Sequence, residues 1–178
     1  PLRADPAACQ AIRFQSLEPR LLLSRDVNPA QTISGAISVP GQVQQYGFNL
    51  AQDARIVFDS ETNSATLNWS LTGPKGTEVT NRLFSASDSA DIAAGSSPLL
   101  DLAAGDYTLT VDATADNVGS YTFRLIDVLK TQEIVPGTLV SGQLNPASET
   151  DVYRFSATAG ESFYFDRHQS VGGDVRWS

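Results

Sequence analysis

The 178-residue sequence has one cysteine, one histidine and no methionine. A single thiol, at Cys9, cannot close an internal disulfide or supply a multi-thiolate zinc site. The longest purely aliphatic run is the leucine triplet 21–23, whereas a membrane-spanning helix needs about 20 predominantly apolar residues. The chain begins at Pro1 without the apolar region of a secretory signal. We therefore expect a piece of a longer product that is stabilised by packing and does not insert into a membrane.

The charge is also one-sided, because 20 acidic residues face 12 lysines and arginines, which leaves a net charge of −8. The first 30 residues hold four arginines and three acidic residues, so the rest of the chain carries −9. This charge repels phosphate backbones and anionic lipids. It argues against nucleic-acid and membrane-surface partners. With 41% hydrophobic residues the chain can nevertheless bury a core.

Short alternating runs separated by Gly, Pro, Asn, Asp and Ser clusters dominate the chain beyond residue 30, as is typical of all-β domains. The alternation predicts eight strands, at 32–37, 44–50, 54–58, 65–71, 77–84, 98–102, 107–111 and 121–125. Alternate residues of a strand share a face, so the aromatic and aliphatic side chains point inward while Thr and Arg point to water. We expect an all-β fold, an eight-stranded antiparallel, jelly-roll-like β-sandwich.

The sequence repeats internally with an offset of 107 residues. Six of the 27 positions from 33 to 59 are identical in the second copy. They pair Ser34, Gly35, Tyr46, Phe48, Phe58 and Asp59 with Ser141, Gly142, Tyr153, Phe155, Phe165 and Asp166. Most of these are the positions that the alternation places inside. The second copy reaches only about four strands, so we expect it to be incomplete and to expose its apolar rings.

Two stretches resemble known families. Residues 17–24, Leu-Glu-Pro-Arg-Leu-Leu-Leu-Ser, are similar to the LEPR-XLL motif near the N-termini of very large exported bacterial repeat proteins. The modules resemble the bacterial pre-peptidase C-terminal (PPC) domain. The resemblance rests on Val-Ser-Gly-Gln-Leu at 140–144, Asp-Val-Tyr-Arg-Phe at 151–155, and the closing strands at 104–111 and 119–125. It implies a compact β-sandwich, usually a non-catalytic appendage of exported proteases and adhesins, with calcium bound by the collagen-binding members. The acidic residue that commonly precedes the aromatic is Asp151 in the second copy, but Gln44 stands there in the first.

Catalytic groups are scarce. The only histidine, His168, stands beside Arg167 in a predicted loop, and no nucleophile elbow, zinc-protease motif or phosphate loop is present. We therefore expect no catalytic residue and no enzyme activity. Trp69 recurs as Trp177 after a shift of one, which could suggest a sugar-stacking platform. Its alternating neighbours Leu67 and Leu71 favour core packing.

Calcium is the metal that the acidic loops could hold, since Ca²⁺ takes six to eight oxygen ligands. The candidate ligands are Asp59 with Glu61 and Asp112 with Asp116, while Asp88 with Asp91 forms a further pair. None matches an EF-hand or an RTX nonapeptide. The alternative interpretation is that these are solvated loop acids that cap turns and protect sheet edges. No other cofactor is expected.

We divide the chain into a largely irregular leader at 1–30, a complete PPC-like sandwich at 31–128, and a linker with a truncated second repeat at 129–178. The favoured function is a non-catalytic extracellular or cell-surface module that acts as a spacer or in adhesion. Its expected partners are neighbouring repeats and extracellular carbohydrate or protein. The alternatives are a calcium-dependent carbohydrate- or matrix-protein-binding module and an appendage of a secreted peptidase.

Overall fold

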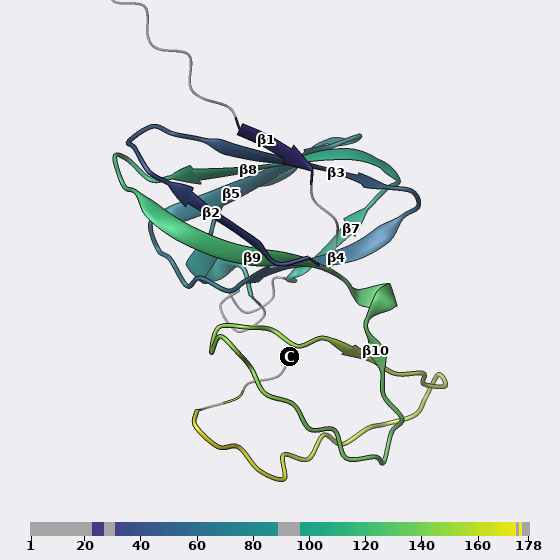
Figure 1. The fold of residues 1–178 in the computed structure, drawn as a ribbon. Coiled ribbons are helices and arrows are strands. Elements are labelled where there is room, and N and C mark those ends of the chain that lie inside the picture. The colour runs from purple at the N-terminus through teal and green to yellow at the C-terminus, as the bar shows by residue number, and fades with distance from the viewer. Residues whose placement is uncertain (1–22, 27–30, 89–96, 174, 176–178) are drawn as a thin grey trace, which may run out of the picture.

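A computed structural model describes residues 23–26, 31–88, 97–173 and 175. Its main body is two β-sheets packed face to face (Figure 1). The first sheet contains β1 (Leu23–Asp26), β3 (Gln44–Leu50), β8 (Gly105–Ala113), β5 (Leu67–Gly73) and β6 (Gly76–Leu83), in that order. The second contains β2 (Ile33–Ile37), β9 (Gly119–Asp127), β4 (Ala54–Ser60) and β7 (Leu99–Leu102). Two short 3-10 helices, Phe84–Ala86 and Val128–Lys130, complete this body.

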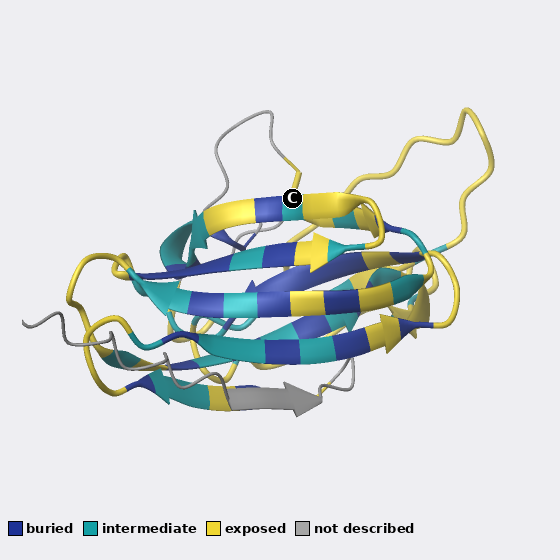
Figure 2. Ribbon diagram, turned by 90° about the horizontal axis from the view of Figure 1, so that it is seen from above, coloured by how far each residue is buried: buried dark blue, intermediate teal, exposed yellow. Residues whose placement is uncertain are grey.

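The expected fold class is confirmed: β2 to β9 are the eight predicted strands, and they pair antiparallel within two stacked sheets. The alternation that predicted them is visible as buried and exposed residues following one another along the strands (Figure 2). Along β9, for example, Tyr121, Phe123 and Leu125 are buried and the residues between them are not.

Aromatic rings fill the space between the sheets. Trp69 is fully buried and stacks on Phe58 with ring centroids 4.1 Å apart, while its indole Nε1 donates to Ser87 Oγ at 2.8 Å. The core assignment of Trp69 is therefore confirmed, because a buried ring cannot offer a sugar platform. The hydroxyls of Tyr46 and Tyr121 join the two sheets through a 2.7 Å hydrogen bond.

The leader differs from the expected irregular chain at four residues. β1 pairs in parallel with the edge strand β3, so that Leu23 lies opposite Gln44 and Asp26 opposite Gly47. The sequence of β1 lacks apolar alternation, and its position is specified by backbone pairing with β3. The other leader residues, including most of the LEPR-XLL stretch and Cys9, lie outside the described residues.

The downstream chain forms little regular structure. Residues 129–173 contain β10 (Gln132–Glu133) and β11 (Tyr153–Arg154), which pair in parallel. Figure 1 shows this part as an extended loop beside the sandwich. Within the described residues the second copy thus forms neither sheet of the first. The two aligned tyrosines differ accordingly, since Tyr46 is 3% exposed and Tyr153 is 36% exposed.

Candidate functional site

Arg124 lies in the middle of β9, directly opposite Asp59 of β4 in the strand register. Its neighbours Phe123 and Leu125 point into the core, so the alternation of the strand directs Arg124 to the outer face of the sheet. The side chain is nevertheless only 21% exposed. The expectation that strand arginines face water is therefore wrong at this position, because other parts of the chain cover it.

Three carboxylates surround the Arg124 guanidinium. Its Nη2 lies 2.6 Å from Asp59 Oδ2, its Nε lies 3.1 Å from Glu61 Oε1, and its Nη1 lies 2.9 Å from Glu149 Oε1. Asp59 is fully buried, and the Glu61 and Glu149 side chains are 9% and 14% exposed. Charge-assisted contacts of this kind are among the strongest in proteins, and the fixed fork of Arg suits several acceptors at once.

The cluster joins the sandwich to the downstream chain. The Thr150 amide donates to Asp59 Oδ1 at 3.0 Å, and Arg124 Nη2 donates to the Thr150 carbonyl at 3.2 Å. Ser148 Oγ donates to the Glu61 carbonyl at 2.8 Å. Residues 148–150 therefore lie against β4 and β9 through both backbone and side-chain contacts. We call Asp59, Glu61, Arg124 and Glu149 the Arg124 cluster.

Burial sets the electrostatics of the cluster. It raises the pKa of Asp59, against the opposing effect of the hydrogen bond and charge of Arg124. Burial likewise raises the pKa of Glu61, and the nearby charges of Asp59 and Glu149 add to this. Burial alone would lower the pKa of Arg124, but its hydrogen bond to Asp59 and the surrounding negative charges raise it overall. The arginine therefore stays charged, while three carboxylates compete for it.

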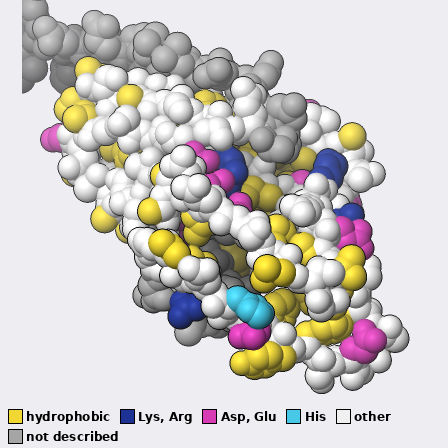
Figure 3. Space-filling model, turned by 60° about the horizontal axis from the view of Figure 1, so that its bottom comes forward, with side chains coloured by type: hydrophobic (Ala, Val, Ile, Leu, Met, Phe, Trp, Pro, Cys, Tyr) yellow, Lys and Arg dark blue, Asp and Glu magenta, His cyan; other side chains and the backbone are white. Residues whose placement is uncertain are grey.

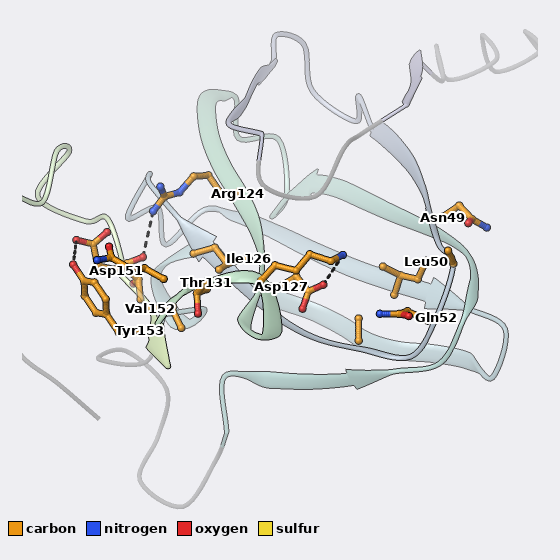
Figure 4. Close-up of a pocket in the computed structure, with 15 residues that line it drawn as sticks. Asn49, Leu50, Gln52, Arg124, Ile126, Asp127, Thr131, Asp151, Val152 and Tyr153 are labelled. Atoms are coloured by element: carbon orange, nitrogen blue, oxygen red, sulfur yellow. Dashed lines mark hydrogen bonds and ion pairs between the residues drawn. The ribbon is translucent and has the colours of Figure 1, made fainter. Parts of the chain in front are cut away.

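A cleft of about 640 Å³ opens next to the cluster. Figure 4 shows Arg124, Asp151 and Tyr153 on one side of it and Asn49 and Gln52 on the other. Two charged residues of its lining pair with each other, since Lys130 Nζ lies 2.8 Å from Asp127 Oδ2. The Tyr153 hydroxyl points to Asp151 Oδ2, at 3.4 Å. The cleft lies between the sandwich and the downstream chain.

The structure places Asp59 and Glu61, one of the predicted calcium pairs, around the same side chain. Asp59 and Glu61 both face Arg124, whose guanidinium takes the place that a cation would need. Asp112 lies on β8 in the other sheet, where its carboxylate accepts from the Ala113 amide, and Asp116 follows in the turn before β9. Asp88 accepts from the Ser60 amide at 2.7 Å, and Asp91 lies outside the described residues. In the part of the chain described, no group of three or more His, Cys, Asp or Glu side chains is arranged to hold a metal ion.

His168 is 71% exposed, and its Nε2 lies 3.7 Å from Asp166 Oδ2, so it sits at the surface of the downstream chain. Sequence reasoning missed Arg124 and Glu149. One sequence feature could have pointed to Arg124, because an arginine between two inward apolar residues stands opposite an aspartate that the repeat singles out.

No protein-family model matches the chain, and no curated protein matches it. Among solved structures, the chain is similar to PliG of Salmonella Typhimurium, a periplasmic inhibitor of g-type lysozyme. That match has 18% identity and a TM-score of 0.42, and it covers 57% of this chain and 97% of the inhibitor.

The chain is also similar to the pre-peptidase C-terminal domain of collagenase from Bacillus anthracis, with 18% identity and a TM-score of 0.41 over 61% of this chain and 99% of that domain. A PliG mutant from Escherichia coli matches at 16% identity and a TM-score of 0.42, covering 57% of this chain and 96% of the inhibitor. A pre-peptidase C-terminal domain thus stands among the structural neighbours, while the fold class rests on the two sheets themselves. None of the helices in the described residues has the length and apolar character needed to cross a membrane.

Proposed function

We propose that the chain is a non-catalytic β-sandwich module of a large bacterial surface or secreted protein. Within that protein it spaces or presents other domains through repeats arranged in tandem. The observation that carries this proposal is the Arg124 cluster, which ties the sandwich of the first copy to Glu149 and Thr150 of the second. A spacer needs such a junction, because a freely hinged linker would not set the position of the next domain.

The cluster is suited to holding two copies together. Its partners come from both sides of the junction, with Asp59 and Glu61 on the sandwich and Glu149 on the downstream chain. Removing Arg124 would leave the fully buried Asp59 without its cation, which is much more costly than breaking a surface pair. The direction that the chain takes after β9 therefore depends on this contact. Under this proposal the work of the module is mechanical and no residue is catalytic.

Hydrogen exchange tests the junction directly. We expect the Thr150 amide, which donates to Asp59, to exchange slowly in the parent chain. In Arg124→Met the Thr150 amide should exchange faster, while amides in the centre of β8 stay protected. Arg55→Met is the matched control, because Arg55 pairs with Asp101 on the surface of the same sheet. An unprotected Thr150 amide in the parent chain, or equal Thr150 exchange in Arg124→Met and Arg55→Met, would contradict the proposal.

Calcium-dependent binding of carbohydrate or matrix protein is the alternative. Melting the chain in calcium and then in chelator separates the two functions, since a ligand present at 100 times its Kd stabilises a protein by about 2.7 kcal/mol. The spacer function predicts the same melting temperature in both, because Arg124 already neutralises Asp59 and Glu61. A melting temperature that is higher in calcium than in chelator for the parent chain, but not for Asp112→Asn, would favour the alternative. It would also locate the ion at the other predicted pair, Asp112 with Asp116.

A further inference from the structure

The loop between β2 and β3 recurs in the second copy with the same backbone hydrogen bond. In residues 38–42 the Gln42 amide donates to the Val39 carbonyl at 3.1 Å. Residues 145–149 align with this loop at the offset of 107, and there the Glu149 amide donates to the Pro146 carbonyl at 2.9 Å. The first loop joins two strands of the sandwich, whereas the second lies outside both sheets. The shape therefore belongs to the loop itself.

The side chain at the last position of each loop closes the loop. Gln42 Oε1 accepts from the Ser38 amide at 2.6 Å, and Glu149 Oε2 accepts from the equivalent Asn145 amide at 2.7 Å. A local bond from a side chain to a backbone amide is a common way to fix a turn. One oxygen atom is enough for this bond, so glutamine and glutamate hold their loops equally well.

The other terminal atom of the two side chains differs in chemistry. Glu149 has a second acceptor, Oε1, which lies 2.9 Å from Arg124 Nη1 on the sandwich. Gln42 has the donor Nε2 instead, and its single oxygen already accepts from the amides of Ser38 and Val39. A guanidinium carries donors only. Glutamate can therefore close the loop and bind an arginine at the same time, whereas glutamine can only close the loop.

The sandwich presents a receiving face to this loop. Alternate residues of a strand point to opposite faces, yet β4 is buried at every position from Ile56 to Ser60. Val57 and Asp59 are thus buried on the outer side of the sheet, where Ile126 and Arg124 of β9 stand opposite them in the register. The outer side of the β4–β9 pair is therefore covered, as the core side is.

Arg124 has one donor group left for the loop. Its Nη2 faces Asp59 and its Nε faces Glu61, both on the sandwich, so Nη1 is the group that meets Glu149. Figure 3 views the molecule from the side of the downstream chain, and basic side chains there have acidic ones near them. The receiving face thus combines apolar residues with a guanidinium donor that fits one further carboxylate.

We propose that the last residue of this loop determines whether a repeat docks on the repeat before it. A glutamate, as at Glu149, binds the arginine of the receiving face, and a glutamine, as at Gln42, does not. The proposal rests on the spacer function above and names the residue that selects the neighbour. The contact is head to tail, because a loop of one copy meets a sheet of the other. The first sandwich accordingly has a receiving face but no docking loop.

Hydrogen exchange of single amides in the full 178-residue chain tests this proposal. Glu149→Gln gives the second loop the residue of the first. The glutamine oxygen can still accept from the Asn145 amide, so exchange of that amide should be the same as in the parent chain. The Thr150 amide should exchange about tenfold faster, because the loop loses its hydrogen bond to a charged group, Arg124.

Glu161→Gln is the matched control. Glu161 also closes a short loop of the downstream chain, since its Oε2 accepts from the Thr158 amide at 2.7 Å, and it is exposed. The substitution removes the same charge from the same part of the chain. It should leave the exchange rate of the Thr150 amide at the value of the parent chain.

Three results overturn the proposal. Thr150 exchange in Glu149→Gln at the rate of the parent chain would mean that the carboxylate does not select the neighbour. Equal acceleration of Asn145 and Thr150 would mean that Glu149 only holds its own loop. Equal acceleration of Thr150 in Glu161→Gln would mean that the net charge of the downstream chain matters and the position of Glu149 does not.

Arg124→Met separates this proposal from the spacer function. If Thr150 exchange is faster in Arg124→Met but unchanged in Glu149→Gln, the junction exists and the proposed selection by glutamate is wrong. If neither variant changes Thr150 exchange, both the junction and the selection are wrong.

Discussion

At Arg124 one guanidinium faces three carboxylates, and the difference between this cluster and an ordinary surface ion pair can be measured. Arg124→Met keeps the apolar stem but leaves the fully buried Asp59 without its cation. We expect the free energy of unfolding to fall by about 3–5 kcal/mol, as for other broken buried pairs. Arg55→Met removes an exposed pair whose side chains are 55% and 70% accessible, and should cost about 1 kcal/mol or less. Urea unfolding of the two variants checks this, and similar losses would show that the cluster contributes no more than a surface pair.

The raised pKa values in the cluster predict a pH dependence. A carboxylate whose pKa is higher in the folded state binds more protons when folded, so its contribution to stability is full below its unfolded pKa. That contribution is lost as pH rises through the higher folded value. Burial raises the pKa of Glu61 above its ordinary 4.5, so its contribution to stability is lost at pH values above 4.5. The parent chain should therefore gain stability relative to Glu61→Gln as pH is lowered from 7 toward 4.5. If the difference in free energy of unfolding between the parent chain and Glu61→Gln stayed constant over this pH range, the raised pKa of Glu61 would be contradicted.

The residues of the cluster were only partly predictable. Asp59 was a candidate ligand, and the repeat places Asp166 at the same position. The sequence does not show, however, whether a calcium ion or an arginine neutralises a carboxylate. Arg124 was assigned to solvent because its strand position faces away from the core. Glu149 and Thr150 bury Arg124, and they lie too far along the sequence for a local pattern to predict the contact.

Among the elements, the end of β5 depends on a glycine. A Cβ atom at Gly73 would overlap the ring of Tyr107 on the neighbouring strand β8. Tyr107 is 2% exposed, and its hydroxyl donates to the Ala103 carbonyl at 2.8 Å, so the ring has little freedom to move. We expect Gly73→Ala to lower the free energy of unfolding by about 1–3 kcal/mol through overpacking.

Gly119→Ala is the matched control for that substitution. Gly119 begins β9, and the nearest atom to an added Cβ would be a Leu67 methyl carbon at an ordinary 3.8 Å. The control should leave stability unchanged or raise it by up to about 1 kcal/mol, because alanine restricts the unfolded chain. Thermal unfolding of both variants is the measurement. Equal effects would mean that the ring of Tyr107 can move aside.

Strands such as β2 and β9 were predictable because they bury one face, which requires alternation in the sequence itself. β3, for example, is found at the expected residues Gln44–Leu50. β1 could not be predicted this way, since backbone pairing with β3 specifies it and leaves no apolar pattern. Residues 161–167 have the alternation of a strand but form none, because in the described part of the chain neither a facing sheet nor a central strand buries their rings.

For the whole molecule, the position of the core predicts which part of the chain folds alone. The buried cluster lies entirely between Ile33 and Leu125, and the downstream chain adds the contacts of Ser148, Glu149 and Thr150 and the β10–β11 pair. A chain shortened to residues 1–134 should therefore unfold cooperatively. Its free energy of unfolding should be lower by at most about 2 kcal/mol, because Asp59 becomes hydrated when its downstream partners leave.

The shortened chain retains Trp69 and lacks Trp177, so its fluorescence reports the core alone. Trp69 is fully buried against Phe58, and its emission should stay blue-shifted until the urea transition. Full-length Glu149→Gln is the control that separates loss of one charge from loss of the whole segment. A shortened chain with red-shifted emission and a gradual transition would mean that the downstream residues complete the first core. The sandwich would then not be an independent module, and the spacer function would lose its structural unit.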